Sequence, residues 1–160
     1  MPKIAKPRLT TSPLSFFRAA DGHRTALHHL APIVNPEGQP NTSVFFAYYN
    51  VFGFCLELYL KAFLSTKGKT ADELAREPYR HDLTRLYADA VDEQIHTYSG
   101  LPLVHPSALD KVISIVAPDH GSYAFRYISA DDASYTYFKS LEIVLLVVDD
   151  LHAKIQNVIM

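Results

Sequence analysis

The feature that most constrains the fold is a long apolar segment, residues 45–63, that carries one acid and one base among aromatic residues. Apolar side chains recur there at spacings of three and four, which is the period of one helix face. They are Phe45, Tyr48, Tyr49, Phe52, Leu56, Tyr59, Leu60 and Phe63. A polar residue at 41–43 can cap this helix, which we expect to be central and to run to about Thr66. Its two charged residues, Glu57 and Lys61, therefore need polar partners.

Two further helices are expected around this central one. The first should begin at a cap on Ser12, with proline in its first turn, and end just before Pro32. A proline-rich connection then leads to the central helix. Beyond that helix, a capping box from Thr70 to Glu73 predicts a short helix that ends before Pro78.

The second half of the chain also shows helical patterns. One helix should begin near His81, and its acidic residues should lie on the face exposed to solvent, namely Asp89, Asp92 and Glu93. A shorter helix is expected from Pro106 to about Val116, and a loop over residues 119–129. A capping-box pattern at Ser129 to Asp132 predicts the start of the last helix, whose apolar seam reaches Ile155.

These elements predict an all-α protein. Residues 1–12 are basic, contain proline and lack periodicity, so we expect a flexible arm there. Residues 13–160 are expected to form a single domain, since 160 residues with 48% hydrophobic content suit one core.

Charge and composition narrow the classes of function. Fifteen basic residues against 17 acidic ones give a net charge of −2, which excludes the broad positive surface of a non-specific nucleic-acid binder. The single cysteine, Cys55, lies in the apolar helix and is expected to be buried and reduced, as in the cytoplasm. The aliphatic run 143–148 is too short to cross a bilayer, so no membrane segment is expected.

Three short polar landmarks resemble those of the HEPN superfamily of small helical domains. They occur in order at Glu57-Leu58-Tyr59-Leu60-Lys61, at His81-Asp82-Leu83-Thr84-Arg85-Leu86 and at Arg126-Tyr127. The resemblance covers about the middle half of the chain. It implies an up-and-down bundle of four to five main helices, a tendency to form homodimers, and a role in RNA cleavage, nucleotide transfer or phage defence, including toxin–antitoxin systems. Many members lack the catalytic motif, so the resemblance does not by itself imply an enzyme.

The nuclease members carry an arginine followed a few residues later by a histidine, and Arg76 and His81 match that spacing. Arginine can neutralise a scissile phosphate, and histidine can move the proton of a ribose hydroxyl without a metal. However, Glu77 places negative charge beside such a site and Pro78 breaks the helix between the two groups. The alternative interpretation is that His81 and Asp82 simply start a helix.

The landmark residues are expected to form one polar cluster, either structural or ligand-binding: Glu57, Lys61, His81, Asp82, Arg126 and Tyr127. Glu57 and Lys61 are one helical turn apart and can pair with each other. We also expect Glu57 to accept hydrogen bonds from His81 or Arg126, because a buried carboxylate without partners is costly. Arg126, between two aromatic residues, could instead bind RNA or close a loop.

No metal site or cofactor is predicted. His23, His28 and His29 are the only histidine cluster, and their spacing points them in different directions on a helix. The remaining histidines are expected to be isolated surface or satisfied polar residues: His96, His105, His120 and His152. Phosphate loops, paired cysteines and nucleophile elbows do not occur.

The function expected from the sequence is that of a HEPN-like binding module, homodimeric and cytoplasmic, in RNA- or nucleotide-linked stress or defence, without clear catalysis. One alternative is a metal-independent endoribonuclease that uses Arg76 and His81. A third is a structural domain whose aromatic face docks on a partner protein.

Overall fold

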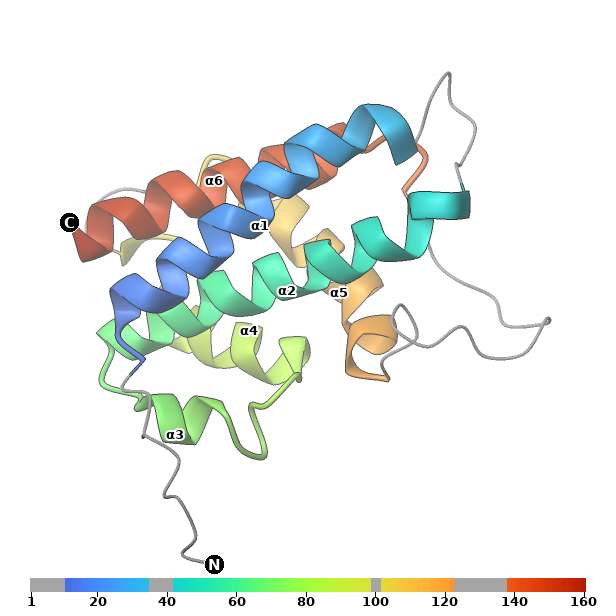
Figure 1. The fold of residues 1–160 in the computed structure, drawn as a ribbon. Coiled ribbons are helices and arrows are strands. Elements are labelled where there is room, and N and C mark those ends of the chain that lie inside the picture. The colour runs from blue at the N-terminus through green and yellow to red at the C-terminus, as the bar shows by residue number, and fades with distance from the viewer. Residues whose placement is uncertain (1–10, 35–41, 99–101, 123–137) are drawn as a thin grey trace, which may run out of the picture.

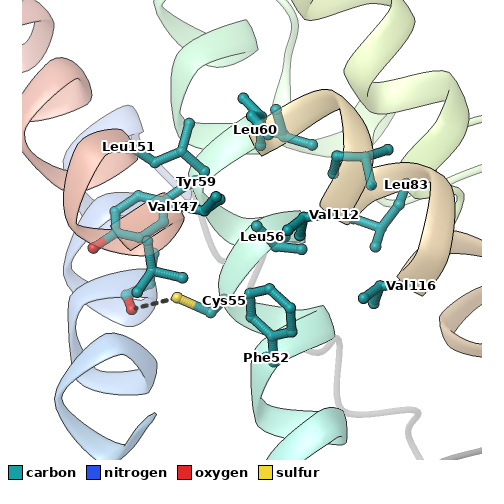
Figure 2. Close-up of a cluster of buried hydrophobic side chains, with 14 of the residues drawn as sticks. Phe52, Cys55, Leu56, Tyr59, Leu60, Leu83, Val112, Val116, Val147 and Leu151 are labelled. Atoms are coloured by element: carbon teal, nitrogen blue, oxygen red, sulfur yellow. Dashed lines mark hydrogen bonds between the residues drawn. The ribbon is translucent and has the colours of Figure 1, made fainter. Parts of the chain in front are cut away.

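The helix expected to be central, α2 (Thr42–Thr66), does lie at the centre of the fold (Figure 1). It packs against α1 (Pro13–Val34), α4 (Leu83–Asp92), α5 (Pro106–Gly121) and α6 (Glu142–Ile159). Its apolar side chains face different neighbours. In Figure 2, Phe52 and Leu56 lie toward Val112 and Val116 of α5, whereas Tyr59 lies toward α6. Because all of these side chains are buried, α2 is the element around which the hydrophobic core is built.

The computed structural model describes residues 11–34, 42–98, 102–122 and 138–160. Within these ranges it contains helices and no strand, so the predicted all-α class is confirmed. The helices are α1 (Pro13–Val34), α2 (Thr42–Thr66), α3 (Ala71–Leu74), α4 (Leu83–Asp92), α5 (Pro106–Gly121) and α6 (Glu142–Ile159). None of these described helices is both long and apolar enough to cross a membrane. The expected arm lies almost wholly outside the described residues.

Helix α1 runs antiparallel to α2, and α6 lies beside α1 (Figure 1). The predicted cap is present, because Ser12 Oγ accepts a hydrogen bond from the amide of Ser15 at 3.1 Å. The predicted stop before Pro32 is wrong, since the helix continues to Val34. Pro32 removes only its own amide donor from the last turn, and burial of Val34 favours the additional residues.

The local signals before α3 and α4 are confirmed. Thr70 and Glu73 form the reciprocal capping box of α3. Asp82 is the N-cap of α4 and accepts from the amide of Arg85 at 2.9 Å. One prediction for α4 is wrong, because Asp89 does not face water. Its side chain is only 15% exposed, and its carboxylate accepts a hydrogen bond from the hydroxyl of Tyr79 at 2.6 Å.

The last two helices differ from their predicted limits. Helix α5 continues past Val116 to Gly121, so the beginning of the expected 119–129 loop is helical. Helix α6 begins at Glu142, and the expected start at Ser129 to Asp132 lies outside the described residues. Phe138 precedes α6 in non-helical conformation. Its amide donates to the hydroxyl of Tyr49 at 2.7 Å and its ring stacks on the Tyr49 ring, contacts that hold this segment on the core.

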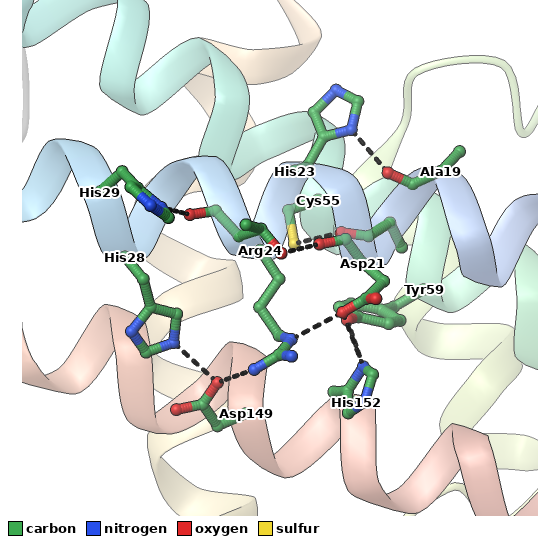
Figure 3. A network of polar contacts seen from close by, with 12 residues as sticks. Ala19, Asp21, His23, Arg24, His28, His29, Cys55, Tyr59, Asp149 and His152 are labelled. Carbon is green, nitrogen blue, oxygen red and sulfur yellow. Dashed lines mark hydrogen bonds and ion pairs between the residues drawn. The ribbon is translucent and has the colours of Figure 1, made fainter.

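A polar network joins α1 to α6 (Figure 3). Arg24 donates to Asp21 at 3.0 Å and to Asp149 at 2.8 Å, and His28 contacts the same Asp149 oxygen at 2.9 Å. His152 contacts Asp21 at 3.2 Å and the Tyr59 hydroxyl at 3.0 Å. We call these residues the α1–α6 network. Beside it, Cys55 is buried as predicted, and burial raises the pKa of its thiol.

Candidate functional site

A buried carboxylate on α2 brings together three segments that are distant in the sequence. Glu57 is 3% exposed, and its Oε2 accepts from Nε2 of His120 at 2.8 Å and from Nδ1 of His81 at 3.1 Å. Its Oε1 accepts from the ammonium of Lys61 at 2.7 Å. We call these four residues the Glu57 cluster. It links α2, the turn before α4 and the carboxyl end of α5.

Part of the polar cluster expected from the landmark residues is therefore present. The hydrogen bond between Glu57 and His81 and the pair between Glu57 and Lys61 are confirmed. Asp82 lies next to His81 and caps α4, while Arg126 and Tyr127 lie outside the described residues. The described part of the chain thus joins two of the three landmarks through one carboxylate.

The residue that sequence reasoning missed is His120, which was expected to be isolated but is 3% exposed against Glu57. A signal was present, because His120 continues the buried stripe of α5 at Val112, Val116 and one turn further on. Gly53 provides the space for it: a Cβ at that position would lie 2.2 Å from Nδ1 of His120. The ring of Phe54 makes edge-on contacts with the imidazoles of both His81 and His120.

The electrostatics of the cluster keep Glu57 ionised. Burial alone would raise the pKa of its carboxyl. The hydrogen bond from His120, the charge and hydrogen bond of Lys61 and the hydrogen bond from His81 outweigh burial and lower that pKa to about 2. Glu57 is therefore a fixed negative charge at neutral pH, available to orient the imidazoles.

Lys61 connects this charge to the wall of a cavity. Its ammonium donates to the carbonyl of Arg80 at 2.7 Å, as well as to Glu57. Arg80 and His81 then contribute to a cavity of about 490 Å³, within the size range of small-molecule sites. The lining residues are Glu77, Arg80, His81, Asp82, Ala117, Pro118 and Gly121. Buried residues of α2 thus position a cavity between the turn before α4 and the end of α5.

Arg76, the other residue of the sequence motif, is not among the residues that line this cavity. Its guanidinium lies 3.7 Å from Asp72, and its side chain is 75% exposed. Between Arg76 and His81 the chain forms turns rather than helix, and Pro78 follows a cis peptide bond. The structure thus brings His81, but not Arg76, to the cavity.

The three histidines that cluster in the sequence do not converge. Nδ1 of His23 and of His29 each contact a carbonyl of their own helix, and His28 contacts Asp149. In contrast, Glu57, His81 and His120 each offer one atom, and these atoms all lie within 4.8 Å of one another.

The residues that line the cavity include Arg80, which is exposed, His81, whose imidazole is oriented by Glu57, and the two acids Glu77 and Asp82. Such a set can bind a ligand that carries both an anion and hydroxyl or amino groups. Comparison with family models, with curated proteins and with solved structures gives no match to this chain.

Proposed function

We propose that this chain is a HEPN-like helical module that binds a nucleotide, free or as part of an RNA, in the cavity beside His81. The observation that carries the proposal is the double anchoring of the cavity wall. Glu57 holds the imidazole of His81, and Lys61 holds the carbonyl of Arg80. Both anchors come from the buried face of α2, so the two residues reach the cavity from a rigid support.

The charges around the cavity fit a nucleotide better than a bare phosphate. Arg80 offers a guanidinium, which binds phosphate oxygens through paired hydrogen bonds. Glu77 and Asp82 line the same cavity and would repel an isolated anion. Their carboxylates can accept hydrogen bonds from ribose hydroxyls or from the amino groups of a base.

The assignment to the HEPN-like group is supported by the helical architecture and by the contact between the first two landmarks. Glu57 and His81 are 24 residues apart in sequence, yet they share a hydrogen bond in the core. The resemblance also motivates the proposal of a homodimer. Light scattering on the purified protein should give twice the 18.0 kDa mass of one chain, and a single-chain mass at micromolar concentration would contradict the dimer.

Binding can be tested by fluorescence anisotropy with a labelled single-stranded RNA and with labelled nucleotides, in buffer containing EDTA. Arg80→Ala keeps the backbone carbonyl that Lys61 holds, so the fold should be retained. Because a hydrogen bond to a charged group contributes about 1.5–3 kcal/mol, we expect affinity to fall roughly 10- to 100-fold. Arg76→Ala is the matched control and should bind like the wild type. Equal affinity of Arg80→Ala and the wild type would overturn the proposal.

A metal-independent endoribonuclease is the second candidate, favoured by the carboxylate that orients His81. The same RNA provides its test. Cleavage that persists in EDTA and is lost in both Arg76→Ala and His81→Ala would establish the enzyme. Intact RNA that remains bound would support the binding module.

A further inference from the structure

We infer that Glu57, His81 and His120 form a binding site for a divalent transition-metal ion, with Zn²⁺ the best match. Two imidazole nitrogens and one carboxylate oxygen approach one point from three segments of the chain, all within 4.8 Å of one another. Two histidines and a glutamate are a common ligand set of zinc sites that keep a coordination position open. The inference goes beyond the proposed nucleotide binding and does not depend on it.

The distances suit a metal of this size. Zinc lies about 2.0–2.2 Å from nitrogen and oxygen ligands, so ligand atoms in a tetrahedral site are separated by roughly 3–3.5 Å. Oε2 of Glu57 is 2.8 Å from Nε2 of His120 and 3.1 Å from Nδ1 of His81. The two imidazole nitrogens lie within 4.8 Å of each other, so binding of the ion requires side-chain rotations that bring all three atoms to a separation of roughly 3–3.5 Å.

The two oxygens of Glu57 have separate roles in this arrangement. Oε2 accepts from His120 at 2.8 Å and makes the shorter of the two contacts with His81, 3.1 Å, so it is the ligand atom. Oε1 is held by the ammonium of Lys61 at 2.7 Å and lies 3.3 Å from Nδ1 of His81. Ligating carboxylates are usually fixed by such an outer hydrogen bond. The charges of Lys61 and of Arg80 at the adjoining cavity oppose a nearby cation, whereas Glu57 and the cavity residues Glu77 and Asp82 supply three negative charges that favour one.

Without metal, each imidazole nitrogen that faces Glu57 carries a proton and donates a hydrogen bond to the carboxylate. In the bound form the ion takes the place of these protons. Each proton moves to the other nitrogen of its ring or leaves to solvent, and no oxidation or further reactant is involved. The hydrogen-bonded cluster and the metal site are thus two states of the same side chains.

Ligand type and access distinguish among possible ions. Imidazole suits zinc and neighbouring transition metals, whereas Mg²⁺ and Ca²⁺ prefer oxygen ligands throughout. Glu57 and His120 are buried, while the side chain of His81 is 25% exposed and lines the cavity. An ion would therefore enter from the His81 side, where water or a ligand could occupy the remaining position.

Isothermal titration calorimetry of the EDTA-treated and dialysed full chain with ZnCl₂ tests the site directly. We expect one zinc ion per chain, and Co²⁺ should give a visible absorption spectrum typical of nitrogen and oxygen ligands at low coordination number. In His81→Asn the amide can still donate to Glu57 from near the place of Nδ1, but it is a poor zinc ligand. Loss of outer-shell partners weakens metal sites about 10- to 100-fold, so loss of a ligand should weaken binding at least 100-fold.

His29→Ala is the matched control, since His29 is exposed and contacts only a carbonyl of its own helix, and it should bind zinc like the wild type. Circular dichroism and thermal unfolding establish that each variant is folded. His120→Gln offers a second test at the buried ligand and should also lose zinc. No saturable binding by the wild type, or equal binding by folded His81→Asn, would overturn the inference. Neither result bears on nucleotide binding, which is measured in EDTA.

Discussion

The Glu57 cluster and the α1–α6 network both join helices through carboxylates, but they distribute charge and solvent differently. In the first, one carboxylate that is 3% exposed serves three donors. In the second, two carboxylates, Asp21 and Asp149, accept the contacts, and their side chains are 40% and 44% exposed. When a buried carboxylate loses one of its partners, water cannot take the place of that partner. At an exposed carboxylate it can.

The two regions also differ in what lies beside them. The Glu57 cluster adjoins a cavity lined by four charged or titratable side chains. The α1–α6 network lies between two helices and continues inward to the Tyr59 hydroxyl in the core (Figure 3). We therefore expect stability and ligand binding to be linked at Glu57, and only stability to depend on the α1–α6 network.

The strongest test of this comparison is Glu57→Gln, measured by urea unfolding without metal. The amide removes the charge that Lys61 and the histidines share, and leaves an ammonium buried without its counter-ion. Removing one partner of a buried pair costs about 3–5 kcal/mol, and we expect a loss in that range. A loss below about 1 kcal/mol would place this carboxylate in the same class as the surface ones.

Gly53→Ala tests the seat of His120 and should have the next largest effect. The new Cβ would lie 2.2 Å from Nδ1 of His120, so the ring must shift from the position in which it contacts Glu57. Overpacking of this kind costs about 1–3 kcal/mol. We expect this cost to exceed the free energy gained from the higher helix propensity of alanine.

Gly22→Ala is the matched control in α1, where a Cβ would meet nothing within 4 Å. There, alanine should stabilise the protein by about 0.5–1 kcal/mol. Thermal unfolding of both variants gives the comparison. Effects of the same sign would show that His120 is not tightly seated.

Asp149→Asn should have a smaller effect than either change at the buried cluster. It removes the ion pair with Arg24 and weakens the contact with His28, and water can partly replace both at this exposure. We expect a loss of about 1 kcal/mol or less, reduced further by added salt. Urea unfolding at low and high ionic strength measures it. A loss as large as that of Glu57→Gln would remove the distinction between the two regions.

The pH dependence of that difference should be the smallest effect. Burial alone would raise the pKa of Asp149, but hydrogen bonds from His28 and Arg24 outweigh it and lower the pKa below 3.8. A lowered pKa means that the folded state prefers the ionised carboxylate. Its stabilisation is therefore present above pH 3.8 and is lost as the pH falls through the lowered value.

The free-energy difference between wild type and Asp149→Asn should thus be constant near neutral pH and shrink as the pH falls from about 5 through the lowered pKa. Unfolding curves over the part of this range in which both proteins remain folded provide the measurement. A difference that grows toward acid would show that Asp149 is not held ionised by its partners.

Local signals in the sequence predicted the starts of α1, α3 and α4, but not that of α6. The capping box at Thr70 and Glu73 and the cap at Asp82 involve residues three apart, so the pattern contains the whole interaction. The partner of Glu57 at His81 was also predictable, because a buried carboxylate demands donors. The all-α class followed from the apolar periodicity of the long helices.

Contacts that depend on the return of the chain were not predictable in the same way. His120 reaches Glu57 from 63 residues away, and only the packing of α5 on α2 brings them together. Asp89 was assigned to water from the apolar stripe of α4, which does not reveal that Tyr79 folds over it. The extension of α1 past Pro32 likewise reflects burial of Val34 in the tertiary structure.

The bond from Lys61 to the carbonyl of Arg80 has a consequence for motion. Residues 79–82 form a turn and the cap that follows it, and all of them except Tyr79 are at least partly exposed, a setting in which backbone amides ordinarily exchange with solvent quickly. Here that segment cannot swing outward unless an ammonium from the protein interior gives up its acceptor. Hydrogen exchange of the Tyr79 and Asp82 amides should therefore be as slow as in the core helix, so that the rim of the cavity opens only when the bundle itself does.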